Sequence, residues 1–149
     1  MICALSLALL TGGATAFAGT LKGTNGRDRL VGTAGADKIN GRAGVDELRG
    51  RPGNDKLDGG AGDDTIAGDP GNDSLIGGPG ADLLLGGSGA DRIDARDGPG
   101  DNVYGGDGRD EIEAVDGARD KISCGAGRDT VRADKVDSVA GDCESVKRG

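Results

Sequence analysis

Aliphatic side chains recur every nine residues through the middle of the chain. Residues 23–94 divide without a gap into eight nonapeptides, each with glycine at positions one and four, aspartate at position six and an aliphatic residue at position eight. Neighbouring side chains in a strand point to opposite faces, so position eight faces one way and positions seven and nine face the other. The pattern predicts one short extended segment per unit, with a single inward side chain. These inward residues are Leu30, Ile39, Leu48, Leu57, Ile66, Leu75, Leu84 and Ile93.

One aliphatic residue in nine cannot form a core within a single unit, but stacked units can share a continuous apolar row. Successive turns would then lie about 4.8 Å apart, as parallel strands do. The triplet of aspartate, any residue and aliphatic residue continues less regularly after residue 94, and the last one, at Asp137, comes one residue early. Asp101 and Asp120 each belong to a ten-residue unit, Asp101 with Val103 and Asp120 with Ile122. We expect these two units to break the register, which makes both aspartates poor site candidates.

Composition excludes several classes of protein. Glycine accounts for 32 of the 149 residues, which disfavours an all-α fold. Histidine is absent, which removes histidine-dependent catalysis and histidine-ligated zinc or haem. The net charge is −8 and aromatic residues make up 1%, a poor composition for binding nucleic acid. Aspartate supplies 22 of the 26 acidic residues, and together with glycine it favours turns and metal-binding loops.

The eight consecutive units resemble the RTX, or hemolysin-type, calcium-binding nonapeptides, written Gly-Gly-x-Gly-x-Asp-x-U-x with U large and apolar. The resemblance implies an all-β fold, a right-handed parallel β-roll in which two nonapeptides make one turn. It also implies calcium between the loops of units two apart, held by loop carbonyls and the position-six aspartates. Residues 124–132 and 142–146 are more loosely similar to the tail of secreted actinobacterial members.

Carried onto this sequence, the resemblance places alternate position-six aspartates on opposite edges of the roll. Asp28, Asp46, Asp64 and Asp82 would line one edge, and Asp37, Asp55, Asp73 and Asp91 the other. Asp110 and Asp129 extend the set of candidate metal ligands. Eight uninterrupted units offer about six calcium sites. For any single aspartate, a turn-capping role is the alternative.

Position two departs from glycine in five of the eight units. Its non-glycine residues are Thr24, Thr33, Arg42, Arg51 and Asp69. We therefore expect weaker binding in the early units. The firmest sites are expected among Asp55, Asp64, Asp73, Asp82 and Asp91. Without a cation, the stacked carboxylates repel one another inside the Debye length, and the thin core does not offset the entropy of ordering the chain. The calcium-free chain is expected to be largely disordered.

The first eighteen residues differ from the rest. Residues 1–18 carry no charge and contain a short apolar run ending in Ala-Phe-Ala, which predicts a secretory signal peptide cut after Ala18, although the usual basic start is missing. The β-roll is expected over residues 19–149, with regular repeats at 23–94, irregular repeats at 95–132 and a C-terminal cap at 133–149. Cys124 and Cys143 form an even pair in an exported chain, which predicts a disulfide; two buried free thiols are the alternative.

These observations predict a secreted, extracellular or cell-surface, calcium-binding module with a structural or buffering role. The alternatives are a calcium-ordered adhesion or interaction module for a protein or glycan partner, and a remnant of a larger RTX exoprotein. We expect no enzyme activity, no nucleic-acid binding, no membrane span and a monomeric state. Leu83, Leu85 and Ile76 could form a small apolar contact patch, or could simply be scattered surface residues.

Overall fold

A computed structural model describes residues 19–149, and this part of the chain contains fifteen β-strands and no helix. The strands are β1 (Thr20–Lys22), β2 (Arg29–Val31), β3 (Lys38–Ala43), β4 (Glu47–Arg49), β5 (Lys56–Ala61), β6 (Thr65–Pro70), β7 (Ser74–Ile76), β8 (Leu83–Gly89), β9 (Arg92–Asp94), β10 (Asn102–Gly108), β11 (Glu111–Ala114), β12 (Lys121–Gly127), β13 (Thr130–Ala133), β14 (Ser138–Val139) and β15 (Ser145–Arg148). The predicted signal peptide lies outside the described residues.

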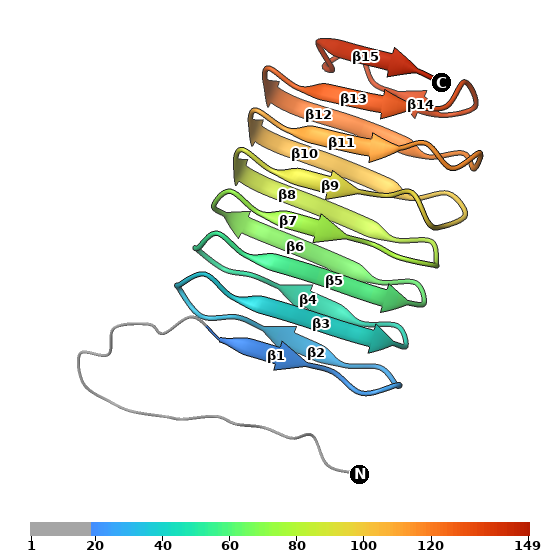
Figure 1. Cartoon of the computed structure of the whole chain (residues 1–149). Helices are drawn as coiled ribbons and strands as arrows, with labels where there is room; N and C mark the ends of the chain where they lie inside the picture. Colours follow the sequence, from blue (N-terminus) through green and yellow to red (C-terminus); the bar gives the residue numbers. More distant parts are fainter. Residues whose placement is uncertain (1–18) are drawn as a thin grey trace.

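Odd-numbered and even-numbered strands form two separate parallel sheets. The eight-stranded sheet has the order β1-β3-β5-β7-β9-β11-β13-β15, and the seven-stranded sheet has the order β14-β12-β10-β8-β6-β4-β2. The chain therefore crosses from one sheet to the other at every strand and returns after two strands, so that flat turns stack on one another (Figure 1). This is a β-solenoid of about seven turns, and the predicted all-β roll of stacked nonapeptides is confirmed.

The nine-residue period determines the register of both sheets. Within the regular repeats each strand residue pairs with the residue eighteen positions later, as in Ile39↔Leu57 and Leu57↔Leu75. Position eight therefore meets position eight in every turn. Several strands are longer than the predicted triplet, because they continue into the first three positions of the next unit, as β3 and β5 do.

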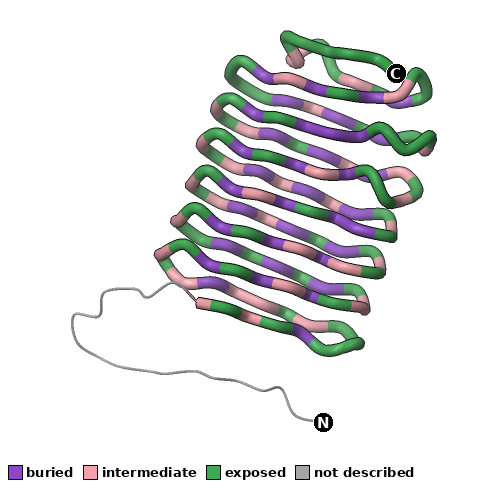
Figure 2. The backbone as a smooth tube through the Cα atoms, in the orientation of Figure 1, coloured by how far each residue is buried: buried purple, intermediate pink, exposed green. Residues whose placement is uncertain are grey.

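The inward aliphatic side chains form the core between the two sheets. Ile39, Leu48, Leu57, Ile66, Leu75, Leu84 and Ile93 are at most 1% exposed, as predicted. Leu30, in the first turns, is only partly buried. The core continues through Val103, Ile112, Ile122 and Val131. In Figure 2 buried and more exposed residues alternate along the strands, which is the pattern expected when one face of each sheet meets the core.

Glycine permits the close stacking of the loops. Position two takes a positive φ at Gly60 (98°) and position four at Gly62 (124°), a region that glycine enters without steric cost. A Cβ atom at Gly62 would overlap the carbonyl oxygen of Gly44 in the preceding turn. Position two does not require glycine, because Arg42 and Arg51 adopt φ values of 82° and 72° there.

The ten-residue units do not break the register, so that expectation was wrong. Val103 pairs with Leu84 and with Ile122, each nineteen positions away, in the same parallel ladder as the regular repeats. The additional residue is accommodated in the loops that precede β10 and β12, outside the paired strands. Loops tolerate such insertions because their backbone is not held by the ladder of hydrogen bonds.

Ile76 does not share a face with Leu83 and Leu85, so the three do not form one apolar patch. Leu83 and Leu85 lie on β8, in the seven-stranded sheet, whereas Ile76 lies on β7, in the eight-stranded sheet. Leu83 and Leu85 therefore lie on one face of the roll and Ile76 on the other. Within residues 19–149 no helix is long and apolar enough to cross a membrane.

The predicted disulfide between Cys124 and Cys143 is present and ties β12 to the segment that leads into β15. The two cysteines are separated by nineteen positions, and their Cα atoms lie 5.1 Å apart. The bond thus joins the last complete turn to the end of the stack.

Candidate metal centre

The position-six aspartates form two single files, one along each edge of the roll. Each lies immediately before a strand, and its backbone is fixed by that strand's pairing with the turns on either side. The first ladder runs through Asp28, Asp46, Asp64, Asp82, Asp101, Asp120 and Asp137. The second runs through Asp37, Asp55, Asp73, Asp91, Asp110 and Asp129. The predicted division of the eight regular aspartates between two edges is confirmed, and Asp101 and Asp120 join them.

Hydrogen bonds between turns hold one oxygen of each carboxylate. The Oδ1 atom of Asp82 accepts the backbone N–H of Asp64 at 2.8 Å, and the Oδ1 atom of Asp73 accepts that of Asp55 at 2.7 Å. The same bond is repeated along both ladders. The short side chain of aspartate is long enough to reach the N–H of the adjacent turn.

The second carboxylate oxygen is left without a partner through most of both ladders. Ten Oδ2 atoms are buried and accept no hydrogen bond from any group in residues 19–149. They belong to Asp46, Asp55, Asp64, Asp73, Asp82, Asp91, Asp101, Asp110, Asp120 and Asp129. An unpaired buried polar atom is costly, and an unpaired buried charge is more so, which indicates that these oxygens need a cation or a proton.

Backbone carbonyls lie close to these unpaired oxygens. A Cβ atom placed on Gly41 would lie 2.5 Å from the Oδ2 of Asp46 and 2.5 Å from the carbonyl oxygen of Gly59 in the next turn. The equivalent point beside Gly68 lies between Asp73 Oδ2 and another such carbonyl. The glycine at position one therefore leaves room for a carboxylate oxygen and a carbonyl oxygen to converge. A donor set made only of oxygen suits a hard divalent cation such as Ca²⁺.

Burial raises the pKa of the carboxylates in the middle of the ladders. Desolvation, opposed by the backbone hydrogen bond and assisted by repulsion from neighbouring ladder acids, raises the pKa of Asp73 and of Asp82 to about 7. Desolvation likewise raises the pKa of Asp91, Asp101 and Asp120 to about 6. The charged form is therefore disfavoured in these ladders unless a cation compensates it.

In the first aspartate of each ladder, Asp28 and Asp37, the Oδ2 atom does accept hydrogen bonds. The Oδ2 of Asp28 accepts the backbone N–H of Thr24 at 2.6 Å and its hydroxyl at 2.9 Å. The Oδ2 of Asp37 accepts the corresponding groups of Thr33 at 2.5 and 3.1 Å. The sequence signal was the threonine at position two, which predicted weaker sites but not this direct hydrogen bonding.

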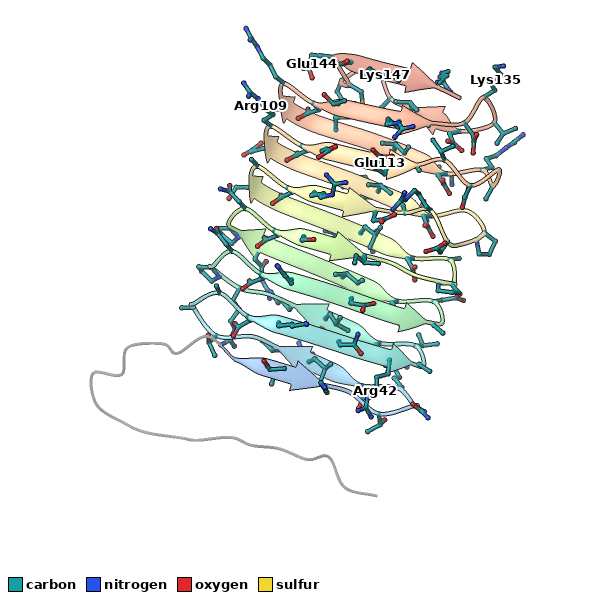
Figure 3. The ribbon with its side chains drawn as sticks, viewed as in Figure 1. Arg42, Arg109, Glu113, Lys135, Glu144 and Lys147 are labelled. Carbon is teal, nitrogen blue, oxygen red and sulfur yellow. A yellow bond between two sulfur atoms is a disulfide. The ribbon has the colours of Figure 1, made fainter. Side chains whose placement is uncertain are left out.

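Three acidic residues at the C-terminal end were not identified as site residues from the sequence, and two of them, Asp137 and Glu144, complete the ladders. Asp137 accepts the N–H groups of Asp120 and of Asp134, at 3.0 and 2.6 Å. Glu144 takes the place of a ladder aspartate and accepts the N–H of Asp129 at 2.9 Å. Asp142 accepts the Ser123 hydroxyl at 2.7 Å, and that bond is the first cause of its lowered pKa. Figure 3 shows Glu144 at the last turn of the stack.

Each ladder is a single row of carboxylates along one edge of the roll, not a cluster around one point. Among residues 19–149, no three aspartate, glutamate or cysteine side chains converge as a metal cage. A cation bound at these loops would therefore take few carboxylate oxygens and would depend on backbone carbonyls for the rest of its coordination.

Comparison with known families agrees with this geometry. The family model of the RTX calcium-binding nonapeptide repeat matches four times, over residues 22–57, 40–75, 68–99 and 100–131. The chain belongs to the RTX calcium-binding nonapeptide repeat family. The four matches extend from residue 22 to residue 131, and so include the irregular repeats. No curated protein and no solved structure matches the chain.

RTX repeats bind calcium, and the buried aspartate ladders of this chain fit such an ion. Their unpaired carboxylate oxygens and the adjacent loop carbonyls are the ligand types that Ca²⁺ prefers. The family is structural rather than catalytic.

Proposed function

We propose that this RTX protein is an extracellular calcium-binding module whose folding depends on the ion. The observation that carries the proposal is the set of ten buried Oδ2 atoms with no hydrogen-bond partner in the described residues. Because burial disfavours these charges, calcium binding and folding are the same event, and the free energy of binding becomes free energy of folding.

The ligands proposed are the ladder aspartates together with loop carbonyls from adjacent turns. Each ladder contains five consecutive aspartates with an unpaired oxygen, and therefore four intervals between turns. This arrangement supports about eight ions, compared with the about six expected from the regular repeats alone. Ca²⁺ supplies the positive charge, while the chain's own role is to hold the oxygens in register.

Secretion is part of the same proposal. The disulfide between Cys124 and Cys143 suits an oxidising compartment, where millimolar calcium would also keep the loops occupied. The uncharged segment 1–18 would then direct export and be removed after Ala18. Intact mass of the protein recovered outside the cell tests this, because the proposal requires a chain that begins at Gly19.

The decisive experiment is a far-UV circular dichroism titration of the protein from chelator to about 10 mM Ca²⁺, with Mg²⁺ in parallel. The proposal expects a disordered chain that becomes β-rich with calcium and not with magnesium, since magnesium requires a tighter octahedral site. A spectrum that is β-rich in chelator and unchanged by calcium would show that the ladders are only structural turns.

A further inference from the structure

Two threonines distinguish Asp28 and Asp37, in the first turn of the roll, from the ten later aspartates whose Oδ2 atoms are unpaired. Thr24 donates both its amide and its hydroxyl to Asp28 Oδ2, and its own hydroxyl oxygen accepts the N–H of Gly26 at 3.2 Å. Thr33 does the same with Asp37 and with the N–H of Gly35. Asp28 and Asp37 therefore already have donors at the oxygen that is unpaired from Asp46 onward.

The difference follows from the backbone at position two. In the next two units, Arg42 and Arg51 adopt positive φ at this position, and the Oδ2 atoms of Asp46 and Asp55 are unpaired. Threonine is branched at Cβ and is disfavoured at positive φ. Neither Thr24 nor Thr33 adopts a positive φ, and each turns its amide and hydroxyl toward its own aspartate.

We propose that Thr24 and Thr33 close the first turn of the roll without calcium, so that ion binding begins with Asp46 and Asp55. This rests on the proposed calcium-binding function and specifies where it starts. An N–H and an O–H group together supply the partial positive charge that the cation supplies in later turns. A calcium ion at the first turn would have to compete with these donors for the Oδ2 atoms of Asp28 and Asp37.

The consequence is a terminal turn that, in the folded protein, needs no calcium of its own to compensate its ladder carboxylates. Terminal units of a repeat protein have a neighbour on one side only and need their own means of closure. At the other end the same role falls to Asp137 and Glu144, which accept the last ladder N–H groups. The calcium-dependent turns therefore lie between two ends that are closed by hydrogen bonds, and the disulfide reinforces one of them.

Calcium stoichiometry of the full chain tests the inference. Native mass spectrometry or equilibrium dialysis at saturating calcium should give about eight ions for the wild-type protein. The double variant T24G/T33G frees both oxygens and permits positive φ, so it should bind about two more ions. The double variant R42T/R51T extends the threonine arrangement by one turn and should bind about two fewer. T24S/T33S retains both hydroxyls and is the matched control with the wild-type count.

The outcomes separate this inference from the proposed function. A wild-type protein that binds no calcium would overturn the proposed function itself. Binding by the wild type, with the same number of ions in T24G/T33G and in R42T/R51T, would overturn only the role of the threonines. Circular dichroism of each variant shows whether it folds. If one double variant does not fold, the ion count of the other double variant tests the role of the threonines.

Discussion

Replacing Asp82 by asparagine should change the stability of the fold in opposite directions with and without calcium. Asp82 is 1% exposed and lies in the middle of the first ladder. Its Oδ1 accepts the N–H of Asp64 at 2.8 Å, and its Oδ2 has no partner within the described residues. Asparagine keeps the acceptor and the size of the side chain, and removes the charge.

Without calcium the substitution should stabilise the fold. Desolvation raises the pKa of Asp82 from 3.8 to about 7. At 1.4 kcal/mol per unit, ionising this carboxyl at pH 8 costs the fold about 4 kcal/mol as an upper bound. The new amide group is buried beside the glycine loop, and without an acceptor it costs about 1–3 kcal/mol. The net expectation is a gain of about 1–3 kcal/mol in chelator.

With calcium the same substitution should destabilise the fold. Asp82 adjoins two intervals of its ladder, toward Asp64 and toward Asp101. Losing one ion that binds only the folded state costs about 2.7 kcal/mol when calcium is at 100 times its dissociation constant. We therefore expect a loss of about 3 kcal/mol at saturating calcium, together with one or two fewer bound ions.

The assay is a comparison of folding free energies at pH 8 in both conditions. Urea unfolding measures the calcium-bound protein, and folding induced by trimethylamine N-oxide measures the chain in chelator. D107N is the matched control, because Asp107 is exposed on β10 and the charge change is the same. A D82N protein destabilised in both conditions, or unchanged in chelator, would refute the argument that an unpaired buried charge opposes folding.

Three further predictions concern protons, the disulfide and the glycine loops. In chelator, acid should substitute for calcium: a carboxyl such as Asp82, whose pKa rises from 3.8 to about 7 on folding, contributes stability that is complete below about pH 4 and is lost as the pH rises through about 7. Circular dichroism in chelator should therefore show β-structure increasing from pH 8 to pH 5, and a flat profile would contradict the raised pKa values. Replacing Cys124 and Cys143 by serine should cost about 3 kcal/mol for a loop of this length, measured as the urea midpoint at constant calcium; an unchanged midpoint would mean that the end of the stack needs no covalent closure. Gly62→Ala should lose most of the calcium-induced folding, because its Cβ would overlap a carbonyl oxygen of the preceding turn, whereas Gly141→Ala, with nothing within 4 Å, should behave as wild type; equal behaviour of the two variants would contradict the stacking geometry.

The regular part of the fold was predictable because one period controls it. The spacing of Leu57, Leu75 and Ile93 determines strand position, face and register together, and the structure agrees at each residue. The register of the ten-residue units was not predictable by counting, because the additional residue before Asp101 lies in a loop and leaves the pairing of Val103 unchanged.

The acidic residues that end the ladders were harder to identify from the sequence. Glu144 lies fifteen positions after Asp129 instead of eighteen or nineteen, and its longer side chain makes up the difference. No repeat pattern includes it, so only the three-dimensional path of the last turn reveals the contact. The hydrogen bonds of Thr24 and Thr33 could not be predicted from the sequence for a related reason. They depend on the φ angle at position two and on the direction of the amide there, which only the structure gives.

The pairing of residues eighteen positions apart also constrains how such a gene can change in length. Deleting one nonapeptide would move every later strand to the opposite sheet, so that the face containing Leu83 and Leu85 would continue the face containing Lys38 and Lys56. Deleting or duplicating eighteen residues would leave both sheets and both edges continuous. Evolution can therefore lengthen or shorten this chain by whole turns with little disruption, whereas a half-turn change would recombine two surfaces at once.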